Sequence, residues 1–217
     1  MARAVSGPTA PRRGSPALPQ TLVLAPLLRD VMGQALVLDA EQSAIDALID
    51  ALRRALEELA PVVPSDLSPR RTAEGPGRVY LDHASAVSTY NPCFPPFELT
   101  PAGEQASGSV EFPIPFEGPP GIVHGGFLGL FFDAAVQEHN CALGVAGKTV
   151  SLQVDFVRPA PLLKRLTFEL GRTVDGRRST TDGVLLDDGE VCTRASVVAV
   201  VGDPSKLAPV ALRESEA

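Results

Sequence analysis

The sequence has 217 residues, which suits one medium-sized domain with extensions or two small domains. Hydrophobic residues make up 44% of it, enough for a packed core, and the formal net charge is −7. This acidic balance argues against a nucleic-acid-binding protein, because such proteins usually carry a basic face.

Cysteine content and hydropathy narrow the class of protein further. Cys93, Cys141 and Cys192 are far apart and form no CxxC motif. We therefore expect no disulfide framework and no zinc site, and free thiols favour a cytoplasmic location. No apolar run approaches the roughly 18 residues that a membrane span needs. The apolar residues 21–28 follow two arginines, but they are few and no small-residue cleavage site follows, so we expect no signal peptide.

The N-terminal part contains one strong pattern. Residues 1–36 begin with a stretch rich in proline, alanine, serine and arginine, which predicts a disordered tail. Within residues 37–62, apolar residues recur at steps of three and four and predict a helix over residues 39–60. Asp39 and Gln42 could form its capping box, and Pro61 would end it. The simplest interpretation is that its stripe packs on the main domain, and a partner-binding helix is the alternative. The stripe consists of Ile45, Leu48, Ile49, Leu52, Leu56 and Leu59.

Residues 91–202 form the main predicted domain, after a linker at residues 63–90 and before a C-terminal tail at 203–217. The expected strands cover residues 97–99, 106–114, 148–157, 164–174, 179–186 and 191–201. A helix is expected from Gly125 or Gly126 to about Gly144, with Gly144 at its C-terminal cap. Two of the last links contain Asp-Gly, which is typical of hairpin turns and predicts antiparallel pairing.

This order of elements predicts an α+β fold with a hotdog architecture. A single apolar helix is buried most economically when a curved antiparallel sheet wraps around it. The N-terminal helix would be an extension to this fold. Two such sheets commonly join edge to edge, so a homodimer is the expected minimum.

One face of the long helix departs from its apolar character. Gly126, Gly129, Asp133, Gln137 and Asn140 follow at steps of three and four, so they share a face. Burying a carboxylate is costly unless it is paired or used. Asp133 is therefore either a structural residue, paired or hydrogen-bonded, or a functional carboxylate that faces a cleft.

The start of this helix favours the functional interpretation. Gly125 and Gly126 allow a substrate to approach the backbone closely. Their N–H groups lie at a helix N-terminus, where unpaired donors and the dipole favour negative charge. This is the form of an oxyanion hole, which together with a carboxylate suggests acyl transfer to water.

These motifs resemble the hotdog-fold acyl-CoA thioesterases of the phenylacetate-pathway type, within the 4-hydroxybenzoyl-CoA thioesterase superfamily. The resemblance lies in "VHGG" with Asp133 nine residues after its histidine, in "VDFVRPAPL" and "VDGRRS", and in the final "ASVVAVV". It covers roughly residues 90–202. It implies hydrolysis of an acyl-CoA without a metal or another cofactor, by a homodimer or homotetramer.

The resemblance also implies roles for individual residues. Asp133 would be the general base or the nucleophile, the Gly125 N–H would polarise the thioester carbonyl, and His124 would fix the loop. Thr149 matches a residue that orients the water in some members. Phe156 would line the acyl tunnel, and Gly126 would let the substrate approach. Arg158 and the turn Gly176, Arg177 and Arg178 would face the coenzyme A phosphates, for which a glycine turn flanked by arginines is suited. Some members have an asparagine where this chain has Gly118, and the family site forms between two subunits.

Two other functions stay open on this fold. A non-catalytic acyl-CoA binder or sensor would not need Asp133. A hotdog hydratase would need a histidine where the segment beginning at Asn91 has Phe94. His124, Asp133, Glu138 and His139 have poor spacing for a metal site. His83 is interpreted as a loop residue, Cys141 as a core residue, and Arg194 as either an ion-pair partner or a phosphate contact.

Overall fold

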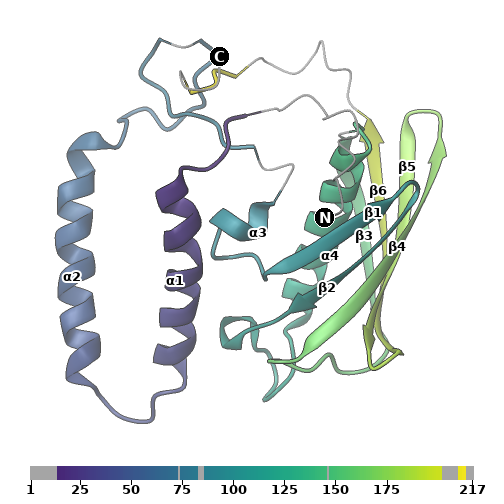
Figure 1. Ribbon diagram of the computed structural model, residues 1–217, viewed down its shortest axis with the longest axis horizontal. Helices are drawn as coiled ribbons and strands as arrows, with labels where there is room; N and C mark the ends of the chain where they lie inside the picture. Colours follow the sequence, from purple (N-terminus) through teal and green to yellow (C-terminus); the bar gives the residue numbers. More distant parts are fainter. Residues whose placement is uncertain (1–13, 73, 83–85, 146, 202–209, 214–217) are drawn as a thin grey trace, which may run out of the picture.

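A computed structural model describes residues 14–72, 74–82, 86–145, 147–201 and 210–213. Its main body is a six-stranded antiparallel sheet that curves around one long helix, α4 (Gly125–Ala142), as Figure 1 shows. A pair of helices, α1 (Pro19–Leu36) and α2 (Ser43–Leu59), lies on the far side of α4 from the sheet. The predicted α+β hotdog architecture with an N-terminal helical extension is confirmed.

The sheet has the strand order β1-β2-β4-β5-β6-β3. Its strands are β1 (Phe97–Ala102), β2 (Gln105–Glu111), β3 (Gly147–Phe156), β4 (Arg165–Asp175), β5 (Arg178–Asp187) and β6 (Glu190–Val201). All neighbouring strands pair antiparallel, and the hairpin turns at Gly176 and Gly189 have positive φ angles, as the Asp-Gly sequences predict. The two edges of the sheet are β1 and β3, so that β3 pairs with β6 alone.

The core lies between α4 and the concave face of the sheet. Phe131 and Phe132 of α4 are fully buried, and Phe131 packs edge-on against Phe168 of β4 and Phe112. Alternate residues of β4 point into this core, which is the period-two burial that a half-buried strand requires. The helix ends as predicted, because Gly144 has a φ of 74° and the N–H of Val145 reaches back to the Asn140 carbonyl.

The prediction of a disordered tail is wrong for residues 19–36, which form α1. Proline at its first turn is compatible with a helix, and the segment that follows is too apolar to remain disordered. α1 packs on the short helix α3 (Val87–Tyr90) and on the 3-10 turn η2 (Ile114–Phe116). Residues 1–13, 203–209 and 214–217 of the two predicted tails, and residue 202 at the end of the predicted domain, lie outside the described residues.

A buried arginine attaches α1 to the segment before β1. The Arg29 side chain donates hydrogen bonds to the carbonyls of Ser88 and Phe94, both at 3.0 Å, and to that of Asn91 at 3.4 Å. Burial lowers the pKa of this guanidinium. The segment that a hydratase would use for catalysis therefore serves here as an acceptor of structural hydrogen bonds.

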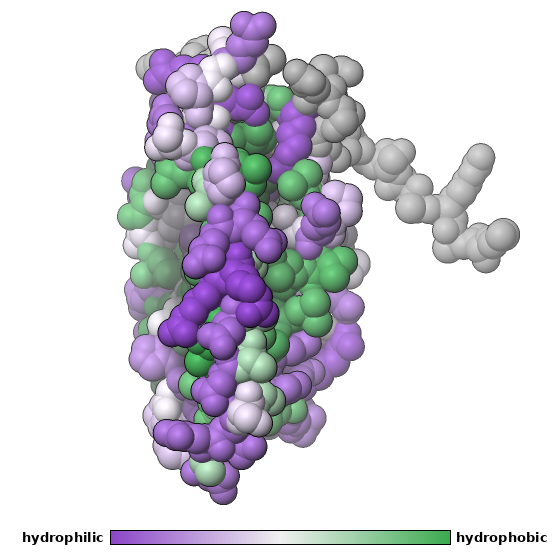
Figure 2. Space-filling view, turned by 90° about the vertical axis from the view of Figure 1, so that its left-hand side faces the viewer, coloured by the Kyte–Doolittle hydropathy of each residue, from purple (hydrophilic) through white to green (hydrophobic). Residues whose placement is uncertain are grey.

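Helix α2 does not pack on the main domain, contrary to the simplest interpretation of its stripe. It runs antiparallel to α1 (Figure 1), and no residue of α2 is buried. Gln42 is its N-cap residue but makes no side-chain hydrogen bond, so the predicted capping box does not form. Pro61 falls in the 3-10 turn η1 (Ala60–Val62) that follows the helix. Figure 2 shows this side of the molecule, with hydrophilic residues down its centre and hydrophobic residues on both flanks.

No helix within the described ranges is long and apolar enough to cross a membrane.

Candidate active site

His124 starts α4 and fixes the loop before it. Its ring Nδ1 accepts the N–H of Gly126 at 3.0 Å, which caps the helix. Its own N–H donates to the Phe116 carbonyl at 2.9 Å. The side chain thus has the position that the resemblance implies. The capping bond also means that the Gly126 N–H is engaged, so one of the two predicted oxyanion donors is not available.

The remaining donor is the N–H of Gly125. It makes no hydrogen bond with any residue that the structure describes. A Cβ at this position would lie 2.7 Å from the Phe156 ring, so the glycine allows the ring to cover the start of the helix. A free N–H at a helix N-terminus, held beside an aromatic ring, is suited to bind a developing negative charge.

Asp133 lies farther along α4 and faces β3. The Thr149 hydroxyl donates to Asp133 Oδ1 at 2.7 Å. Thr149 sits where the register of β3 against β6 shifts, and a bulge of this kind turns a side chain to a new direction. The two residues that the resemblance pairs are therefore in direct contact.

Asp133 is half-exposed rather than buried, which corrects the expectation from its apolar neighbours in sequence. The reason is the position of β3 at the edge of the sheet, where it covers only one side of this part of α4. Gly129 lies one turn earlier on the same face, and a Cβ there would touch Leu152 at 3.6 Å and Val154 at 3.9 Å. The small residues thus let β3 approach α4 closely.

The predicted polar face of α4 divides into two parts. Gly129 and Asp133 contact β3 and Gly126 lies beside the His124 ring, whereas Asn140 is buried at the other end of the helix. Asn140 accepts a hydrogen bond at 3.1 Å from Arg172, whose Nε donates to Glu104 at 2.7 Å. Only the first part therefore belongs to the candidate site.

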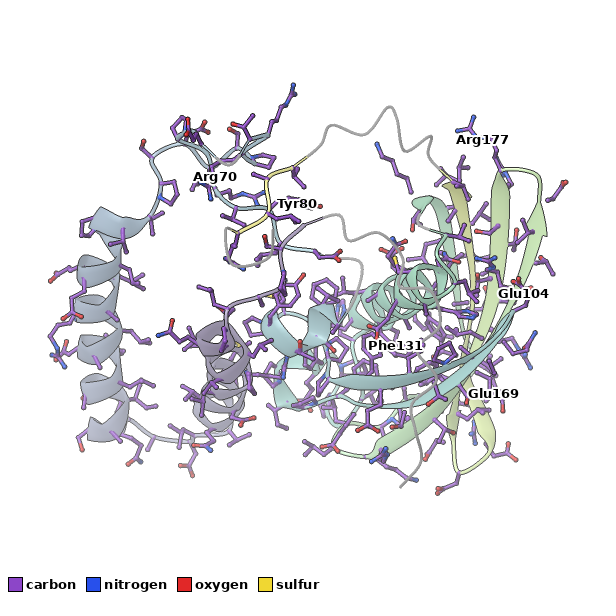
Figure 3. All side chains as sticks on the ribbon, turned by 45° about the horizontal axis from the view of Figure 1, so that its top comes forward. Arg70, Tyr80, Glu104, Phe131, Glu169 and Arg177 are labelled. Carbon is purple, nitrogen blue, oxygen red and sulfur yellow. The ribbon has the colours of Figure 1, made fainter. Side chains whose placement is uncertain are left out.

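Arg172 is a buried charge that sequence reasoning missed. Its side chain is 5% exposed and pairs with Glu104, which is labelled in Figure 3. The sequence pattern of β4 could have revealed it. The core-facing residues of this strand alternate as Leu166, Phe168 and Leu170, and Arg172 is the next position in that series. This ion pair closes the core at the C-terminal end of α4.

A pocket of about 400 Å³ opens beside Gly125. Arg158 is the charged residue of its wall, and its Nε donates to the Val191 carbonyl at 3.1 Å. The position suits a substrate whose thioester would reach the Gly125 N–H from an apolar surface. The other lining residues are Pro119, Ile122, Val123, Leu128, Phe156, Val157, Pro159 and Ala160.

The structure does not bring the predicted phosphate-binding arginines together within one chain. Arg158 follows the Phe156 end of β3, whereas Arg178 pairs with Val200, next to the Gly147 end. Arg177 lies at the same far turn (Figure 3), where it donates to the Val201 carbonyl at 3.1 Å. Arg158 and the turn at Gly176 therefore lie at opposite ends of the sheet in one chain, and their predicted contact with the coenzyme A phosphates stays a prediction.

The remaining candidates have structural partners. His139 is fully buried, and its Nε2 lies 2.8 Å from the Gly103 carbonyl. Glu138 accepts the N–H of Ala86 at 3.1 Å. Among the described residues, no group of three or more His, Cys, Asp or Glu side chains could hold a metal ion. Arg194 lines a shallow pocket on the exposed face of the sheet, together with Asp155, Glu169 and Asp182. His83 lies outside the described residues.

Among known protein families, residues 114–200 match the family described as the acyl-CoA thioesterase N-terminal domain. A crystal structure named as a thioesterase superfamily protein is similar at 27% identity and a TM-score of 0.66, over 87% of this chain and 99% of that one. PaaI of Escherichia coli, from the phenylacetic acid degradation operon, has 17% identity and a TM-score of 0.45 over 48% of this chain and 82% of its own. A Streptococcus mutans protein bound to acetyl CoA has 15% identity and a TM-score of 0.46 over 49% and 89%.

No match to a curated protein was found. The family model nevertheless covers α4 and the four strands after it, which carry Gly125, Asp133 and Thr149. The family model and the thioesterase superfamily structure agree with the resemblance predicted from the sequence, because residues 114–200 match a thioesterase model and the chain shares the fold of that structure.

Proposed function

We propose that this protein hydrolyses an acyl-CoA thioester to a free acid and coenzyme A, at a site shared between two copies of the chain. The matched family supports acyl-CoA thioester hydrolysis in general terms. The observation that carries the proposal for these residues is the hydrogen-bonded Asp133–Thr149 pair on the same helix whose first residue, Gly125, has an N–H without a partner among the described residues.

The separation of these groups argues for a shared site. Asp133 lies eight residues after Gly125, and an α-helix rises about 1.5 Å per residue, so the two are about 12 Å apart along α4. A carbonyl bound by the Gly125 N–H is thus out of reach of Asp133 in the same chain. A second copy, joined antiparallel along the free edge of β3, would bring its Asp133 toward this Gly125.

The exposed surface of β3 supports this pairing. Phe156 and Val157 are more than half exposed, and β3 offers an unpaired edge to another strand. A strand edge of this kind is a template for pairing with another chain. The half-exposed Asp133 would then be enclosed by the partner, where a carboxylate acts in a drier environment. A homodimer is the smallest assembly with this site.

The chemistry follows from the groups present. In the base mechanism, Asp133 takes a proton from water as the water oxygen attacks the thioester carbon. The carbonyl oxygen becomes negative and is stabilised by the Gly125 N–H, an interaction worth about 3 kcal/mol for one donor. The C–S bond then breaks, and the coenzyme A sulfur leaves and takes up the proton. In the nucleophile alternative, Asp133 attacks first and water hydrolyses the resulting anhydride. Thr149 holds the carboxylate in either case.

The deciding experiment measures free coenzyme A by chromatography from short, medium, long and aryl acyl-CoA substrates. We expect turnover of at least one substrate by the wild type, and a loss of 100-fold or more in kcat for Asp133→Asn. Asp155→Asn is the matched control, because Asp155 lies on the outer side of β3.

Full activity of Asp133→Asn would rule out this mechanism. Binding of all four substrates without turnover would instead assign the protein to the non-catalytic binders.

A further inference from the structure

The helices α1 and α2 have no role in the proposed site, and they carry many exposed large apolar side chains, which lie around α1 and along the stripe of α2. Twelve such side chains are each between 39% and 68% exposed. We call these twelve together the hairpin face. It consists of Leu22, Val23, Leu24, Leu27, Met32, Leu36, Val37, Leu38, Ile49, Leu52, Leu56 and Leu59.

The hairpin face is not explained by packing within one chain. α1 uses Ala25 and Arg29 to contact the main domain, which leaves Val23 and Leu27 outside. α2 buries nothing. A helix of 17 residues without tertiary contacts is marginal in water, so the apolar stripe of α2 requires a partner.

The size of the hairpin face fits a stable protein interface. A Leu-sized side chain carries on the order of 100 Å² of apolar surface, so twelve at about half exposure present roughly 600 Å² in total, summed over both helices. A standard interface buries about 800 Å² on each partner, of which roughly 450–520 Å² is apolar. The largest apolar patch on a typical monomer is only about 300–600 Å², and such a patch is often functional.

The charged residues of α1 and α2 indicate which kind of partner the hairpin face can bind. On α1 the charged residues are Arg29, which is buried, and Asp30, which is exposed, so α1 carries one exposed charge. α2 carries four carboxylates and two arginines on the side opposite its stripe, a net charge of −2 that disfavours anionic lipid surfaces. A partner for this face must therefore offer a similar apolar helical surface.

We propose that the hairpin face binds the hairpin face of a second copy of this chain, and that the two helix pairs stack into an antiparallel four-helix bundle. The chain itself supplies a surface of the required chemistry, and a two-fold axis lets one patch bind its own copy. Helix pairs with apolar inner faces assemble in this way when their stripes meet in a common core.

The similarity to the thioesterase superfamily structure extends beyond the sheet domain, into the part of the chain that contains α1 and α2. Residues 91–217 are less than two thirds of the chain. A match over 87% of the chain must therefore extend into the first 90 residues, so that the similar thioesterase superfamily structure carries comparable elements there.

The hairpin face and the β3 edge are separate surfaces, since α2 and β3 lie on opposite sides of the molecule in Figure 1. Two different two-fold contacts on one chain close into a tetramer when their axes cross at right angles. The bundle would then join two dimers, each with its own pair of shared sites, and its loss would leave those sites complete.

The test is the mass in solution of the double variant Leu52→Glu with Leu56→Glu, measured by light scattering behind gel filtration. We expect the mass to fall to half of the wild-type value, with the far-UV circular dichroism and the coenzyme A release rate retained. Val174→Glu, at an exposed apolar position on β4, is the matched control and should leave the mass unchanged.

Hydrogen exchange of wild-type α2 gives an independent measurement. If a second copy covers the helix, protection of its amides falls as the protein is diluted. An unchanged mass in the double variant, or protection that does not depend on concentration, would overturn the proposal. Binding to phosphatidylcholine vesicles that the double variant loses, with its mass unaltered, would assign the face to a lipid surface instead.

Discussion

Asp133 and Glu138 are both carboxylates of α4, yet their surroundings differ. Asp133 is half-exposed and receives a hydroxyl hydrogen bond from Thr149. Glu138 lies against the segment before α3, where burial raises its pKa and the single hydrogen bond from Ala86 opposes that rise. The two side chains therefore differ in their partners, because Asp133 contacts β3 and Glu138 contacts the backbone before α3.

Glu138→Gln is expected to stabilise the protein at neutral pH. Because the folded-state pKa is raised, the contribution of protonated Glu138 is fully present below the unfolded pKa of about 4.3 and is lost as pH rises through the folded value. At pH 7 the ionised side chain therefore lowers the free energy of unfolding, and an uncharged glutamine removes that cost while its oxygen still accepts the Ala86 N–H.

Urea unfolding at pH 7 and at pH 4 measures this effect. The variant should unfold at a higher urea concentration at pH 7, and the difference should vanish near pH 4. Glu57→Gln on the exposed side of α2 is the control. A lower midpoint at pH 7 would contradict the assignment of burial as the dominant effect.

At this scale the sequence predicted which candidate residues share one helix, while their roles stay predictions. Gly126 and Asp133 were placed on one face by their spacing alone, and the resemblance supplied the roles of Gly125 and Thr149. It could not show that His124 engages the Gly126 N–H, because that bond depends on a side-chain rotamer. The separation of Arg158 from Arg177 was accessible in principle, since successive turns of an antiparallel meander lie at opposite ends of the sheet.

At the scale of elements, the strands and α4 agree with their predicted positions to within a few residues, because their hydrophobic periods are strong and their turns contain Asp-Gly. α1 was missed, since its apolar residues surround the helix and leave no clear period, and Pro26 lies within it. Its attachment depends on Arg29, whose acceptors are about 60 residues away along the chain. Such long-range contacts leave no local pattern.

Arg29→Met is expected to lower the free energy of unfolding by about 2–4 kcal/mol, because buried carbonyls at Ser88 and Phe94 lose their donor and each such group costs about 1–3 kcal/mol. Urea denaturation measures the loss. Gln34→Met, on an exposed position of the same helix, should change the free energy by less than about 0.5 kcal/mol. Equal effects of the two substitutions would show that α1 is not held by Arg29.

At the scale of the whole molecule, a shared site predicts that two inactive variants restore each other. Gly125→Pro removes the N–H that binds the carbonyl, and proline is accepted at the first position of a helix after the extended His124. Asp133→Asn removes the carboxylate. A mixed dimer of the two has one site with both defects and one intact site.

Co-refolding equal amounts of the two variants should recover about a quarter of the wild-type rate, because half of the dimers are mixed and each has one working site. Gly125→Ala is the control for Gly125→Pro, since it keeps the N–H and introduces the same contact with Phe156. If Gly125 and Asp133 of one chain act together, the mixture stays as inactive as its components.

The pairing of β3 with β6 alone has a consequence for synthesis. β3 emerges from the ribosome about 40 residues before its partner strand, which is the last strand of the sheet. Until β6 is released, nothing in the sheet holds Thr149 against Asp133, although every residue of the candidate site has already been translated. A nascent chain therefore acquires this contact only at the end of its synthesis, and a chain cut before residue 190 would contain the complete site in sequence but not in space.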